Sequence, residues 1–140
     1  MDPRRRLLRH GLVLFLVGLV TGLAVPAFRN PRMALSGHLE ALLNGMFLMI
    51  VGLAWVELKL SARAQRVIPP VLLVGTYGNF ALTLAGAQLG TKKATPLAGA
   101  GFGASDAAEW AIYGGLGVVV LAMLYVLGTF VLSTWRAQAE

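Results

Sequence analysis

The chain has 140 residues, of which 57% are hydrophobic and 13% charged, and its mean hydropathy is +0.73. A chain this short cannot bury so much apolar surface in a water-soluble core, which argues against a soluble enzyme, and its hydrophobicity excludes a disordered chain. It has no cysteine, which excludes disulfides and thiol chemistry. Its net charge is +6, and the basic residues flank apolar stretches, a pattern that suits a membrane surface rather than nucleic acid.

Four stretches are long and apolar enough to cross a bilayer, which takes about 20 predominantly apolar residues. The sequence predicts spans at residues 10–28, 35–58, 67–89 and 110–135. Residues 1–140 are therefore expected to form one all-α integral membrane domain, a bundle of four transmembrane helices. The first stretch follows a basic flank, as in a signal peptide, but its apolar run is long and its end is a poor cleavage site, so a retained helix is expected.

The distribution of Lys and Arg predicts the orientation, because basic residues concentrate on the cytoplasmic side. With the N-terminus inside, eight basic residues face the cytoplasm and four face the other side. The inner set is Arg4, Arg5, Arg6, Arg9, Lys59, Arg63, Arg66 and Arg136, and the outer set is Arg29, Arg32, Lys92 and Lys93. We expect both termini in the cytoplasm, in a membrane of the bacterial inner-membrane type.

Small residues mark two features between and within the spans. The connection at about residues 90–109 is long and rich in glycine and alanine, so it either lies over the helix ends as a cap or is mobile. Glycines inside the spans, such as Gly18 and Gly22 in the first and Gly114, Gly115 and Gly117 in the last, are expected to let helices approach closely.

Polar side chains within the spans are functional candidates, because they are costly in a membrane. The second span holds His38, Glu40 and Asn44, and the third holds Tyr77 and Asn79. Glu40 and Asn44 share a helix face, whereas Asn44 lies about 120° around the helix from His38. His38 is either a hydrogen-bonded packing residue or an axial haem ligand, since one imidazole suffices when the other iron face binds substrate.

The residues alone leave three functional classes open: a membrane enzyme, a small transporter or channel subunit, and an adaptor or haem-bearing electron-transfer subunit. A transporter needs polar positions through the full membrane depth, yet the last span beyond Tyr113 is nearly all apolar. A membrane cytochrome usually ligates haem with two residues, but His10, the other histidine, is expected at the membrane boundary. No nucleotide, serine-hydrolase or zinc-protease motif is present in the sequence.

The segment around His38, in which Asn44-Gly45-Met46 follows after five residues, resembles the second-helix motif of a small membrane family. That family comprises styrene oxide isomerases and hydroxylaminobenzene mutases. Tyr77-Gly78-Asn79 is similar to its aromatic-Gly-Asn motif, and His10-Gly11 to its N-terminal motif. The segments His10-Gly11-Leu12, Asn30-Pro31-Arg32-Met33 and His38-Leu39-Glu40 are more similar to the mutase branch. The isomerase branch carries a Tyr at the position of Thr83 and an Asp at that of Gly75.

The resemblance implies a redox-neutral, haem-dependent isomerase. It implies haem b as cofactor with His38 as the axial ligand of its iron, Asn44, Tyr77 and Asn79 as catalytic residues, and a homotrimer with haem at contacts between protomers. The expected partners are a small aromatic substrate, the lipid bilayer and the other protomers. The roles of His10 and Glu40 stay open.

The expected reaction converts an aryl hydroxylamine, hydroxylaminobenzene, to the ortho-aminophenol, 2-aminophenol, with ferric haem as a Lewis acid. Two alternatives remain: isomerisation of an epoxide such as styrene oxide, and a non-enzymatic role as a transporter or adaptor subunit.

Overall fold

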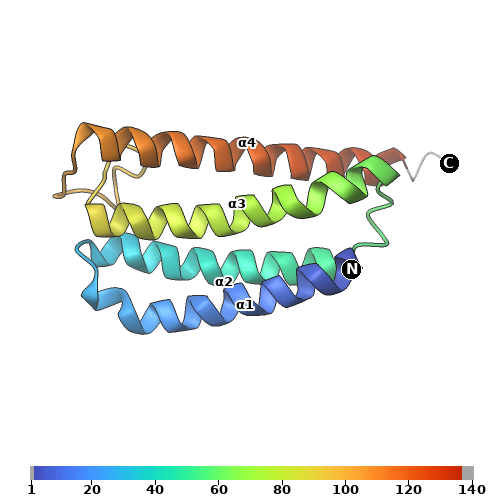
Figure 1. The fold of residues 1–140 in the computed structure, drawn as a ribbon, viewed down its shortest axis with the longest axis horizontal. Helices are drawn as coiled ribbons and strands as arrows, with labels where there is room; N and C mark the ends of the chain where they lie inside the picture. Colours follow the sequence, from blue (N-terminus) through green and yellow to red (C-terminus); the bar gives the residue numbers. More distant parts are fainter. Residues whose placement is uncertain (1, 137–140) are drawn as a thin grey trace.

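The computed structural model describes residues 2–136, with side chains to residue 135, and these residues form four long helices (Figure 1). The helices are α1 (Pro3–Ala24), followed by the 3-10 turn η1 (Val25–Ala27), then α2 (Pro31–Leu53), α3 (Ala62–Leu89) and α4 (Asp106–Arg136). All four are long and apolar enough to cross a membrane. The predicted all-α membrane fold is confirmed. The side chain of Arg136, counted in the charge distribution, lies outside the described residues.

The first three helices begin at capping residues, several positions before the apolar stretches begin. Asp2 accepts a hydrogen bond from the Arg4 amide at 3.0 Å, Asn30 from the Met33 amide at 3.2 Å, and Ser61 from the Ala64 amide at 3.3 Å. These caps satisfy amide groups that have no partner within the helix. The helix ends therefore follow capping chemistry, whereas hydropathy marks only the apolar interior. At its other end, α2 stops at Leu53, and the apolar residues that follow form a turn.

The helices pack side by side as a layer in the order α1–α2–α3–α4 (Figure 1). Helix α2 packs against α1 and α3, and α3 packs against α4. Within the described residues, no close backbone contact joins α4 to α2 or to α1. The start of α1 and the end of α4 lie at the same end of the layer, as an even number of spans requires.

Helices α1 and α2 touch backbone to backbone. A Cβ placed on Gly45 would lie 2.8 Å from the Gly11 carbonyl oxygen, and one on Gly18 would lie 2.9 Å from the Ala41 Cβ. Such contacts leave no room for a larger residue, and the fully buried Leu14 and Ala41 seal the interface. The packing role expected for Gly18 is confirmed.

The glycines of α4 fall into two groups. Gly115 packs against the Leu82 side chain, whereas a Cβ on Gly114 or Gly117 would meet open space. The packing role expected of all three therefore holds for Gly115 alone, and the other two leave space beside α4.

The connection between α3 and α4 is held as a cap over the ends of α2 and α3. The Arg29 guanidinium donates to the carbonyl of Leu89 at 2.7 Å, Asn30 donates to that of Ala98 at 2.8 Å, and Arg32 donates to that of Ala100. The Glu109 carboxylate accepts hydrogen bonds from the amides of Lys92 and Lys93 at 2.9–3.1 Å. Of the two alternatives for this segment, the structure shows the cap.

Candidate active site

His38 lies on the face of α2 that packs against α1. Its Nδ1 is 2.7 Å from the carbonyl oxygen of Gly18, and its ring covers Gly22, where a Cβ would lie 2.8 Å from the ring Cε1. Because a carbonyl oxygen only accepts, Nδ1 carries the proton and Nε2 keeps its lone pair. Metal-bound histidines are usually oriented by this kind of hydrogen bond, which fixes the ring and raises the basicity of the ligating nitrogen.

The surroundings of His38 suit a group that takes a single protein ligand. Among the described residues, no three His, Cys, Asp or Glu side chains lie close enough together to hold a metal ion. A bare metal ion normally requires three or four such ligands, whereas a haem iron can be held by a single protein side chain. The imidazole of His38, with its fixed tautomer and half-buried ring, fits that requirement.

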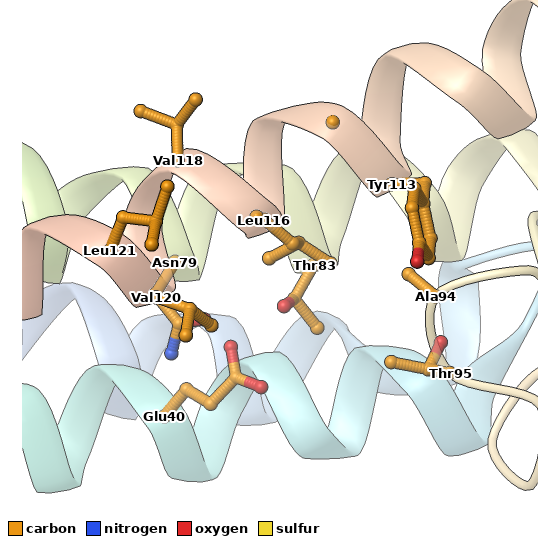
Figure 2. A pocket seen from close by; sticks show the side chains of 12 residues that line it. Glu40, Asn79, Thr83, Ala94, Thr95, Tyr113, Leu116, Val118, Val120 and Leu121 are labelled. Carbon is orange, nitrogen blue, oxygen red and sulfur yellow. The ribbon is translucent and has the colours of Figure 1, made fainter. Parts of the chain in front are cut away.

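The opposite side of α2 borders an open cavity of about 730 Å³ (Figure 2). It lies where α2 and α4 do not touch, with α3 between them. Glu40 comes from α2, Asn79 and Thr83 from α3, and Ala94 and Thr95 from the capping connection. The α4 wall is formed by Tyr113, Gly114, Leu116, Gly117, Val118, Val120 and Leu121. This volume is typical of a site for a small organic ligand.

Glu40 of α2 and Asn79 and Thr83 of α3 are polar groups at one side of this cavity, Thr95 and Tyr113 add hydroxyl groups, and the rest of the α4 wall is apolar. Figure 2 shows the Glu40 carboxyl and the Thr83 hydroxyl turned toward the same space, with Asn79 beside them. The Oε2 atom of Glu40 is buried and has no hydrogen-bond partner among the described residues. The cavity therefore offers a polar end and an apolar side to one ligand.

A second cavity of about 250 Å³ adjoins the first and is lined by Asn44, Gly75 and Asn79 together with apolar residues of α4. Asn79 lines both cavities, so the structure brings the predicted residues Asn44 and Asn79 together. The Asn44 side-chain amide also donates to the Thr76 carbonyl at 3.3 Å, which ties α2 to α3 beside the cavity.

Tyr77 lies on another face of α3 and does not join Asn44 and Asn79. Its hydroxyl donates to the His10 carbonyl at 3.2 Å, and the His10 Nδ1 lies 3.2 Å from the same hydroxyl. The two rings meet edge to face with centroids 5.7 Å apart. His10 is therefore half-buried against α3, and its expected place at the membrane boundary stays a prediction.

Sequence reasoning left Glu40 without a role and treated Thr83 only as a departure from the isomerase branch. The spacing carried a usable signal, because Glu40–Asn44 and Asn79–Thr83 are both four residues apart and each pair shares a helix face. What the spacing could not show is that the two faces meet at one cavity.

The fold and the cavity define an integral membrane protein with an open cavity between α2 and α4 that has polar groups on one side and a largely apolar wall on the other. The sequence model of the family described as styrene oxide isomerase matches residues 3–135. The chain therefore belongs to the styrene oxide isomerase family, as its motifs suggested.

Two curated relatives come from Ectopseudomonas oleovorans. Hydroxylaminobenzene mutase HabB is 42% identical over 136 residues, which cover 96% of this chain and 81% of the relative. Hydroxylaminobenzene mutase HabA is 46% identical over 102 residues, which cover 65% of this chain and 76% of the relative. The family and these relatives make the chain an enzyme of the isomerase class, of the mutase type.

Proposed function

We propose that the protein rearranges an aryl hydroxylamine, in the simplest case hydroxylaminobenzene, to the ortho-aminophenol, here 2-aminophenol. The observation that carries this proposal is the cavity between α2 and α4, in which Glu40, Asn79 and Thr83 face a largely apolar α4 wall. A hydroxyamino group suits the polar end and an arene suits the apolar wall. The two relatives named as hydroxylaminobenzene mutases support the same substrate class.

The proposed reaction is an isomerisation that needs no external oxidant or reductant. The N–O bond breaks, a C–O bond forms at the ortho carbon, and the ring proton lost from that carbon is balanced by one gained at nitrogen. The apolar residues of α4 limit access of water to the cationic ring, and the amides of Asn44 and Asn79 can hold the migrating oxygen by hydrogen bonds. Tyr77 acts as a positioning residue, because its contact with His10 joins α3 to α1 away from the cavity.

Haem b is the proposed cofactor, and Nε2 of His38 would hold its iron. When bound, ferric haem supplies a Lewis acid for the N–O bond. The contribution of this chain is the hydrogen bond from Nδ1 to Gly18, which holds the imidazole in one tautomer and one orientation.

A homotrimer is proposed from the family resemblance, and a site shared between protomers is supported because one protomer separates His38 from the cavity. His38 and Glu40 lie about 160° apart around α2, and His38 packs toward α1. In an assembly, His38 of one protomer can face the cavity of its neighbour, which gives a complete site at each contact between protomers.

A product assay tests the reaction. Purified protein is given hydroxylaminobenzene and styrene oxide in parallel, and the products are separated by chromatography. We expect 2-aminophenol and little rearrangement of the epoxide; the reverse preference would assign epoxide isomerisation instead. An absorption spectrum of the same sample tests the cofactor, since a Soret band is expected and its absence would refute the Lewis-acid mechanism.

The proposed orientation places both termini in the cytoplasm of a bacterial inner membrane. The natural chain has no cysteine, so single cysteines can be introduced at exposed Ala62 and Ala100 and labelled in intact cells. We expect an impermeant thiol reagent to label Ala100→Cys and not Ala62→Cys. The opposite pattern would invert the orientation.

A further inference from the structure

Glu40 carries a buried acceptor that the fold leaves unsatisfied. Its Oε2 atom is inaccessible and has no hydrogen-bond partner among the described residues. Leaving a buried polar atom unpaired is unfavourable, and such atoms in native proteins call for an explanation. Here the explanation is available, because Glu40 lines the cavity between α2 and α4.

The position of Glu40 makes it accessible to the polar end of a ligand. It enters the cavity from α2 and faces Thr83 and Asn79 of α3 (Figure 2). A change of side-chain rotamer can turn the whole carboxyl further into the cavity, where Oε2 can meet a ligand. Across the cavity, Gly114 and Gly117 leave space that an aromatic ring can occupy.

We propose that Glu40 determines specificity by accepting a hydrogen bond from an N–H or O–H group of the ligand. The ligand class is a small arene whose polar group carries a donor, such as an aryl hydroxylamine or an aryl amine. The carboxylate form of Glu40 only accepts hydrogen bonds, and an epoxide ring has an acceptor oxygen and no donor, so an epoxide leaves the Glu40 carboxylate unpaired. The inference rests on the proposed function, because it takes this cavity as the substrate site and adds what that site selects.

An unpaired buried acceptor selects effectively, because only a ligand without an N–H or O–H donor leaves the Glu40 oxygen without a hydrogen bond in the complex. A site built to hydrogen-bond a donor rejects an analogue that lacks it far more strongly than an apolar pocket rejects a missing methylene. The amides of Asn44 and Asn79 both donate and accept, so they do not discriminate in this way. Glu40 is the cavity residue whose chemistry separates hydroxylamines from epoxides.

The test compares aniline with N,N-dimethylaniline, which lacks the two N–H donors. Binding to the detergent-solubilised, cofactor-loaded protein is measured by calorimetry for the wild type, Glu40→Leu, Glu40→Gln and Glu57→Leu. Glu57 is exposed and lies outside the cavity, so its variant controls for loss of a glutamate. We expect the wild type and Glu57→Leu to prefer aniline by about 10- to 100-fold.

Glu40→Leu should remove that preference. Glu40→Gln, which keeps the shape of the side chain but presents donors as well as an acceptor, should reduce it several-fold. A preference as large as that of the wild type in either folded Glu40 variant would overturn the proposal, because the preference would then come from elsewhere, such as direct contact of aniline with a metal centre. The measurement needs no turnover, so a wild type that binds aniline selectively but makes no 2-aminophenol would refute the proposed function and leave the role of Glu40 standing.

Discussion

The two faces of α2 differ in how closely their neighbours approach. Toward α1, Gly45 meets the backbone of Gly11, and the ring of His38 is held by the Gly18 carbonyl. Toward α4, α2 makes no close contact within the described residues, and the gap holds the cavity bordered by Glu40. The close face can fix a ring in one orientation, and the open face leaves room for a ligand.

This difference explains why residues only two positions apart can serve different parts of one reaction. A helix turns by about 100° per residue, so His38 and Glu40 project in nearly opposite directions. The fixed imidazole and the ligand space then belong to separate surfaces of a protomer. Three kinds of experiment test this difference: substitution of a residue on each face, co-expression of variants that are defective on opposite faces, and a substitution that forces α1 and α2 apart.

The largest effect is expected on the close face. His38→Ala should abolish haem binding and nearly all activity, because the proposed axial ligand is lost. The helices should still form, since their spans depend on apolar length rather than on one imidazole. Soret absorbance, turnover and circular dichroism must be measured on the same preparation.

His10→Ala is the matched control for that variant. The His10 ring is engaged with Tyr77, so its removal should leave the haem content unchanged. Normal haem and turnover in His38→Ala would refute the ligand assignment. Loss of haem in His10→Ala alone would transfer that assignment to His10.

On the open face, Asn44→Ala should retain haem but slow turnover by about 10- to 1000-fold, because an amide that stabilises developing charge is removed. Gln88→Ala removes an exposed amide from α3 outside both cavities and should leave the rate unchanged. Equal rates in the two variants would exclude Asn44 from catalysis.

The sequence was sufficient to predict the four membrane helices, because long apolar runs have few other stable structures in a bilayer. It also named His38, Asn44, Tyr77 and Asn79 as candidate site residues, because polar groups are scarce within spans, and their roles stay predictions. It did not show that Tyr77 turns toward His10 while Asn79, two residues later, faces the cavity. Which way each side chain points depends on the helix that packs against each face of α3. A helix that is apolar on all sides gives no sequence pattern from which those neighbours can be predicted.

Co-expression of two inactive variants, one defective at His38 and one in the cavity, is expected to give a smaller but more specific effect, a partial recovery of activity. His38→Ala keeps an intact cavity, and an Asn44→Ala/Asn79→Ala double variant keeps an intact His38. Co-expressed, they should restore activity that neither shows alone, to about a third of the wild-type rate in a mixed cyclic trimer, because one of its contacts then joins an intact His38 to an intact cavity. Mixed oligomers, isolated with two affinity tags, give the rate. Absence of any recovery would place the whole site within one protomer.

The smallest effect is expected from adding one methyl group to the close face of α2, with the same change at an open position of α4 as the control. In Gly45→Ala the new Cβ would lie 2.8 Å from the Gly11 carbonyl oxygen, so α1 and α2 must separate, and overpacking of this kind costs about 1–3 kcal/mol. In Gly128→Ala the Cβ meets open space, and the helix gains up to about 1 kcal/mol from propensity. Thermal melting in detergent should therefore fall for the first variant and hold or rise for the second.

Gly45 lies seven residues from His38, about 20° around the same face of α2, so separation of the helices also disturbs the hydrogen bond from His38 to Gly18. Gly45→Ala should then lose haem more readily than the wild type while still binding aniline in the cavity on the opposite face. Equal melting of the two glycine variants would mean that the backbone contact of α1 and α2 is not maintained. Parallel loss of haem and of aniline binding would mean that the two faces of α2 are not independent.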